Sequence, residues 1–185
     1  MKFARLLARL FIGGMFIGHG TQKLFGWFGG PGIEGTTGMM EKLELAPPRA
    51  NAYAAALSET LGGAAIALGA FTPAAAASLI GTMVTAIRTV HLKNGFWSTG
   101  GGYEYNLTII AALLLIVDGG PGALSVDGAL GIEETGAGAA LGALALGVLA
   151  LGVLGSTVTL AAAKAAGQKA AGEAAAGTVT PQPVG

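Results

Sequence analysis

The chain has 185 residues, of which 52 % are apolar and only 11 % are charged, and its mean hydropathy is +0.66. Soluble domains usually carry about 25 % charged residues, so this composition indicates an integral membrane protein in contact with the lipid bilayer. Ten basic and ten acidic residues cancel, and without a long basic tract no nucleic-acid partner is expected. Cysteine is absent and only two histidines occur, which excludes thiolate-bound metals and iron–sulfur clusters made by this chain, and we expect no metal site.

Five apolar segments predict five membrane-spanning helices, because each is close to the length that crosses a bilayer, about 20 residues. In chain order they are 3–20, 50–69, 73–90, 103–119 and a charge-free run within 136–163. The fold class expected is therefore all-α, an integral membrane helix bundle. We divide the chain into a four-helix core (1–130), an additional transmembrane helix (131–163) and a flexible tail rich in Ala, Gly and Pro (164–185).

Two pairs of glycines are spaced as in close helix–helix contacts of membrane proteins. Gly14 and Gly18 lie four residues apart in the first segment, and Gly138 and Gly142 in the fifth. Small residues at this spacing let two backbones approach closely. Both pairs are therefore predicted to pack against another helix.

One carboxylate, Glu59, lies near the middle of the second apolar segment. An ionisable group at that depth is costly, so it is expected to point into the bundle and to be paired. Burial favours its protonated form, whereas a nearby cation such as Lys23 or Arg88 would favour the carboxylate. Glu59 is the predicted catalytic, proton-carrying residue; the alternative is a protonated carboxyl group with a purely structural role.

Six further polar residues lie at helix ends that alternate crossings place on one side of the membrane. An aromatic belt with cations reaching the interface would explain Trp27 and Trp97, which fall on the same side. It explains a histidine, a glutamate and an asparagine there less well, so we predict a polar pocket with Glu59 as its deepest group. The six residues predicted to bind a ligand are His19, Lys23, Arg88, His91, Glu104 and Asn106.

Several short motifs, taken together, resemble the DoxX family of small bacterial membrane proteins. The first is the stretch 19–26, HGTQKLFG, followed by Glu59 with Gly62 and Gly63. The resemblance continues through 69–73, the stretch 102–107 (GYEYNL), and the loop with Gly120, Pro121, Gly122, Ser125 and Asp127. It covers roughly residues 1–130 and implies a four-helix membrane core, so the fifth apolar run is an extension.

The resemblance implies a multi-pass protein of the bacterial cytoplasmic (inner) membrane. DoxX-like proteins include a subunit of a thiosulfate:quinone oxidoreductase and members linked to oxidative-stress complexes. The first interpretation is therefore a quinone-associated subunit of a membrane redox or oxidative-stress complex, with quinone as a non-covalent cofactor and electrons from a soluble redox enzyme. Whether such a chain is itself an enzyme or an accessory subunit stays open.

The second interpretation is a non-enzymatic membrane anchor or assembly factor for soluble partners, in which the polar groups are structural. A homo-oligomer is compatible with both. A solute or proton carrier would need alternating access, and no internal repeat supports it. Bound quinone in the purified protein would favour the first interpretation, and a copurifying soluble enzyme without quinone would favour the second.

Overall fold

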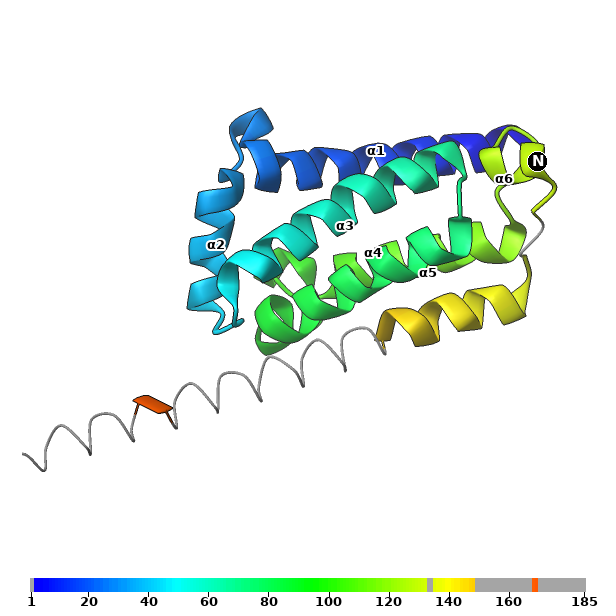
Figure 1. The fold of residues 1–185 in the computed structure, drawn as a ribbon. Helices are drawn as coiled ribbons and strands as arrows, with labels where there is room; N and C mark the ends of the chain where they lie inside the picture. The colour runs from blue at the N-terminus through cyan, green and yellow to red at the C-terminus, as the bar shows by residue number, and fades with distance from the viewer. Residues whose placement is uncertain (1, 133–134, 149–167, 170–185) are drawn as a thin grey trace, which may run out of the picture.

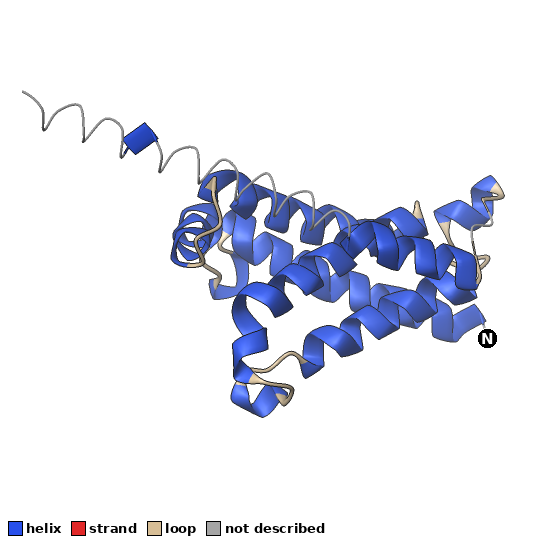
Figure 2. Ribbon diagram, turned by 90° about the horizontal axis from the view of Figure 1, so that it is seen from below, coloured by secondary structure: helices blue, strands red, loops and turns tan. Residues whose placement is uncertain are grey.

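The computed structural model describes residues 2–132, 135–148 and 168–169, and every regular element within them is helical (Figures 1 and 2). The α-helices and the one π-helical segment (η2) are α1 (Lys2–Phe25), α2 (Gly32–Lys42), α3 (Pro48–Leu68), α4 (Thr72–Ala86), η2 (Ile87–His91), α5 (Glu104–Gly119), α6 (Val126–Leu130) and the helix Ala137–Val148. Short 3-10 turns are η1 (Trp27–Gly29), η3 (Leu92–Asn94) and η4 (Ser98–Gly100). The all-α class expected from sequence is confirmed.

Four long helices form the bundle, with successive neighbours in contact: α1 against α3, α3 against α4, and α4 against α5. Figure 1 shows α2 lying across one end of this bundle, and α6 beside the chain's N-terminus at the other end. The helix Ala137–Val148 packs on α4, where Gly147 approaches the backbone of Ala77 and Gly81. The buried apolar core centres on α4 and α5, with Leu79, Ile80, Leu113 and Val117 fully enclosed.

By length and composition, one helix in the described part of the chain could cross a membrane by itself. It is the continuous segment Thr72–Asn94, of 23 residues and mean hydropathy 1.3. The others fall short for visible reasons: α1 carries several cations, α3 holds Arg49 and Glu59, and α5 has only 16 residues. Five separate crossings therefore stay a prediction. Most of the fifth segment and tail, residues 149–167 and 170–185, lies outside the described residues.

The closest helix contact is between α1 and α3, and glycine makes it possible. A Cβ atom on Gly13 would lie 2.5 Å from the carbonyl oxygen of Gly63, and one on Gly20 would lie 2.2 Å from Oγ1 of Thr60. These glycines are not the ones predicted from spacing. Gly14 and Gly18, and likewise Gly138 and Gly142, have open space where a Cβ would be, so that prediction was wrong. The glycines that do contact lie seven residues apart, two helical turns along one face of α1.

Two buried charges hold the turn between α3 and α4. The carboxylate of Asp127 accepts hydrogen bonds from the backbone N–H of Phe71 (2.7 Å) and Thr72 (2.9 Å) and from the Thr72 hydroxyl (2.7 Å), so it caps the start of α4. Arg9, only 1 % exposed, packs against Gly69 at the end of α3 and donates to the Leu124 carbonyl. Each charge is opposite in sign to the partial charge of the helix end it meets, so both interactions are favourable. The α5–α6 loop is thereby fastened over this end of the bundle.

Replacing Gly13 with Ala should destabilise the protein, whereas replacing its neighbour Gly14 should not. The new methyl group at position 13 would overlap the α3 backbone, and overpacking of this kind costs about 1–3 kcal/mol. At position 14 the methyl group meets nothing and alanine favours the helix, so a slight gain is expected. The check is the melting temperature of both variants in the same detergent. Equal melting temperatures would contradict the close α1–α3 contact.

Replacing Asp127 with Ala should cost about 3 kcal/mol, because three hydrogen bonds to one buried carboxylate are lost together. The exposed Asp118 supplies the matched control, and its replacement with Ala should be close to neutral. Thermal unfolding followed by circular dichroism measures both. A loss no greater than that of the control would show that the carboxylate does not hold the turn.

Candidate polar pocket between α1, α3, α4 and α5

A pocket of about 450 Å³ opens at the α2 end of the bundle. Its volume falls in the range of small-molecule sites, and most of its lining is apolar with a few polar groups, which is typical of such sites. Four helices and the η4 loop contribute to its wall. The lining residues are Met15, Phe16, His19, Lys23, Glu59, Met83, Ala86, His91, Ser98, Gly101, Gly102, Tyr105, Asn106 and Ile109.

An ion pair between Lys23 and Glu59 lies in the pocket wall. Lys23, in the last turn of α1, extends its ammonium group to within 2.5 Å of Oε2 of Glu59, half-way along α3. The side chain of Glu59 is 5 % exposed and that of Lys23 is 20 % exposed. Two environments were considered from sequence, burial without a charged partner and burial beside a cation. The structure has the second. Lys23 is that cation, and Arg88 is not.

One ring nitrogen of His91 has a hydrogen-bond partner that determines which nitrogen carries the hydrogen. Its Nδ1 lies 2.7 Å from the carbonyl oxygen of Gly101. A carbonyl can only accept, so Nδ1 carries the hydrogen, and in the neutral ring Nε2 is left as an acceptor. Asn94 donates to the same carbonyl at 3.1 Å, which ties the η4 loop to the end of η2. His91 therefore both fixes the loop that borders the pocket and offers an acceptor there.

Asn106 is the buried amide of the pocket, 5 % exposed. Its Nδ2 donates to the thioether of Met83 at 3.6 Å, and sulfur is a weak acceptor. The amide therefore keeps donor capacity for a ligand. Between α5 and α1, the Tyr105 hydroxyl donates to the thioether of Met15 at 2.9 Å.

The structure brings five of the seven predicted site residues to one pocket and leaves two outside its wall. His19, Lys23, Glu59, His91 and Asn106 line it, with His19 exposed near the mouth. Arg88 is exposed and does not line the pocket, contrary to the predicted convergence. It precedes His91 by three residues, and in the π-helical turn η2 this spacing does not return to the same face as it would in an α-helix.

Glu104 is the other predicted residue that is absent from the pocket wall. Its carboxylate accepts from the Ser98 backbone N–H (3.0 Å) and hydroxyl (2.9 Å), so it shapes the loop instead. Met15, Met83 and Ser98 also line the pocket, although they were not among the residues predicted from sequence. For the methionines, their spacing of four residues from His19 and eight from His91 could have shown a shared helix face.

A family model described as DoxX matches residues 4–92. The matched residues, just under half of the chain, contain Lys23, Glu59 and His91, and with them most of the polar pocket. The match assigns residues 4–92 to the DoxX family. The resemblance noted in 102–107 and 120–127 lies beyond the matched residues. No curated protein and no solved structure matches the chain.

DoxX proteins are generally membrane-associated, which agrees with the apolar helices of this member. In the described part of the chain no three His, Cys, Asp or Glu side chains gather closely enough to hold a metal ion. The chemistry that this DoxX protein's pocket offers is hydrogen bonding and proton exchange, from an ion pair, two imidazoles and an amide.

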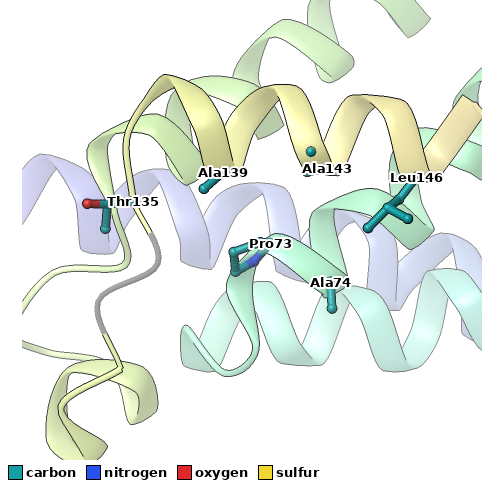
Figure 3. Close-up of a pocket in the computed structure, with 7 residues that line it drawn as sticks. Pro73, Ala74, Thr135, Ala139, Ala143 and Leu146 are labelled. Atoms are coloured by element: carbon teal, nitrogen blue, oxygen red, sulfur yellow. The ribbon is translucent and has the colours of Figure 1, made fainter.

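A second hollow, of about 420 Å³, lies between the start of α4 and the helix Ala137–Val148 (Figure 3). Pro73 and Ala74 face Ala143 and Leu146 across it, and the only hydroxyl group in its lining is that of Thr135. Such a wall has almost no means of orienting a polar ligand. The candidate functional site of this DoxX protein is therefore the polar pocket.

Breaking the Lys23–Glu59 pair should cost much more stability than breaking the exposed pair Arg49–Glu34. The Lys23→Met variant leaves a buried carboxylate without its cation, and losses of about 3 kcal/mol are typical. Arg49 and Glu34 are 3.1 Å apart with side chains 60 % and 74 % exposed, so the Arg49→Met variant should lose less than about 1 kcal/mol. The check is thermal unfolding in detergent.

A double variant, Lys23→Met with Glu59→Leu, distinguishes the cost of an unpaired buried charge from the loss of other contacts made by Lys23. It removes both charges together, so most of the lost stability should return. Failure of the double variant to recover would mean that Lys23 acts through packing of its apolar stem instead.

Proposed function

We propose that this DoxX protein is a multi-pass protein of the bacterial cytoplasmic membrane whose polar pocket binds a quinone, as an accessory subunit of a membrane redox complex. The observation that carries the proposal is the Lys23–Glu59 pair in the wall of a mostly apolar pocket together with His91 and Asn106. A ring with two carbonyl oxygens needs an apolar slot with donors at its edges. This lining has that composition.

The residues of the pocket divide into donors and acceptors. Lys23 and the amide of Asn106 can donate to carbonyl oxygens, and Asn106 has donor capacity that the thioether of Met83 uses only weakly. Nε2 of His91 and the carboxylate of Glu59 can accept from the hydroxyl groups of the reduced form. The pocket can therefore hold both the carbonyl and the hydroxyl forms of such a ring.

Reduction of a quinone to a quinol takes up two electrons and two protons. Glu59 can accept a proton and pass it on, because its carboxylate is hydrogen-bonded to the ammonium group of Lys23, which can donate one. The electrons come, in this proposal, from a soluble redox partner, since a sequence without cysteine has no dithiol or iron–sulfur centre to provide them. The chain thus supplies the ring site and the proton route.

Native mass spectrometry of the protein, extracted in mild detergent from quinone-containing membranes, tests the proposal. Bound quinone is the expected result. Copurification of a soluble enzyme with no quinone would instead favour a membrane anchor or assembly factor.

Glu59→Gln tests the proton route. The amide keeps the shape of the side chain but cannot release a proton, so quinone reduction with the copurified partner should fall about tenfold or more. The exposed Glu34 provides a matched control, and Glu34→Gln should reduce quinone at the wild-type rate. Yield and melting temperature of both variants report folding. A folded Glu59→Gln protein with the wild-type rate would rule out the proton role.

A further inference from the structure

One side of the polar pocket is formed by two helices that hardly pack on each other. α1 makes extensive contact with α3, where its glycines lie, and far less with α5. Between α1 and α5 the pocket wall is made of Met15 and Phe16 on one helix and Tyr105 and Ile109 on the other. These residues are apolar or aromatic. Of the polar groups, Glu59 lies on α3, Lys23 lies nearer the end of α1, and Asn106 on α5 turns toward Met83 of α4.

A single hydrogen bond closes this side. The hydroxyl of Tyr105 donates to the thioether of Met15, and the Tyr105 side chain is nonetheless 52 % exposed. A bond to sulfur is weak, and methionine has three rotatable bonds, so this contact can open at low cost. Tyr105 follows the first residue of α5, so in a membrane-spanning bundle the outer side of this contact would face lipid near the interface.

We propose that the ligand of this pocket is an amphiphile whose long alkyl or isoprenoid chain leaves between α1 and α5, with Tyr105 and Met15 as the gate. The inference rests on the proposed function and adds to it the class of ligand and its route. The ring lies among the polar groups, and the chain follows the apolar wall of Phe16 and Ile109 into the bilayer. Burial of the chain in hydrocarbon then adds to the binding of the ring.

The competing route runs through the other mouth of the pocket, at the loop that contributes Ser98, Gly101 and Gly102. This loop is fixed by the bonds from His91 and to Glu104, and it carries polar backbone groups rather than an apolar wall. A water-soluble ligand would enter there and would need no chain. The two routes therefore predict different positions for the far end of the same molecule.

Photoaffinity labelling distinguishes the routes in the full chain in lipid nanodiscs. The probe is dimethoxy-methyl-benzoquinone with a decyl chain that carries a diazirine near its end, and adducts are located by mass spectrometry. Adducts on the outward face of α1, around Phe11 and Met15, or on the exposed part of α5, around Tyr105, are expected. Excess unlabelled decyl quinone should remove them.

Labelling at other positions would contradict different parts of the proposal. Competed adducts on the loop from Leu92 to Gly102 would overturn the lateral route while leaving a quinone site in place. Adducts that excess quinone does not remove would contradict the proposed function itself. Adducts confined to α2 would overturn both the route and the gate.

A variant of the gate gives an independent measurement. Tyr105→Phe keeps the ring and removes the hydroxyl that binds Met15, so the dissociation rate of decyl quinone, divided by that of the chain-free quinone, should rise about threefold, as for the loss of one weak hydrogen bond. The matched control is Tyr103→Phe, because Tyr103 packs on Phe96 and does not line the pocket. A ratio equal to that of the control would overturn the role of Tyr105 as gate.

Discussion

The close approach of α1 and α3 determines how the rest of the molecule is arranged. The two helices run in opposite directions, and contacts of Gly13 with Gly63 and of Gly20 with Thr60 fix a single register between them. In that register Lys23, one turn beyond Gly20, comes opposite Glu59, which precedes Thr60. The ion pair thus depends on backbone proximity along α1, because a larger separation would leave the carboxylate buried without its cation.

Each end of the bundle contains a cation and a buried carboxylate, but the surroundings of the two pairs differ. At the α6 end, Arg9 and Asp127 are buried against helix termini and the loop from α5 closes over them. At the α2 end, Lys23 and Glu59 are paired but border an open pocket. Both charges at the first end meet backbone groups under a closed loop, whereas the pair at the second end stays accessible to a ligand.

The sequence was sufficient for the fold class, which follows from the length of the apolar segments, and for much of the pocket, which follows from the helix ends that share one side of the membrane. Position along a helix can be read from sequence, but orientation around it is less certain when most neighbours are alanine, glycine and leucine. For this reason Gly14 and Gly18 were chosen over Gly13 and Gly20, and Arg88 was grouped with His91. The helix α2 was missed because its eleven residues include three glycines and give little periodic signal.

Contacts between distant segments could not be predicted at all. Nothing in the spacing of Arg9, Leu124 and Asp127 indicates that they meet, since 115 residues separate the first two. The motif places Asp127 in the loop after the fourth apolar segment, whereas in the fold its buried carboxylate caps another helix, α4. A loop residue and a cap residue look alike in sequence, and only the folded chain distinguishes them.

The π-helical segment η2 has a consequence for how the family can vary. A π-helix holds one more residue per turn than an α-helix, so everything after it is rotated by about one residue's share of a turn. His91 reaches the pocket, and Arg88 leaves it, on account of that extra residue. Loss of a single codon here would restore a regular helix and direct a different side chain at Gly101. Insertions and deletions between Met83 and His91 should therefore be selected against more strongly than substitutions of the exposed residues among them.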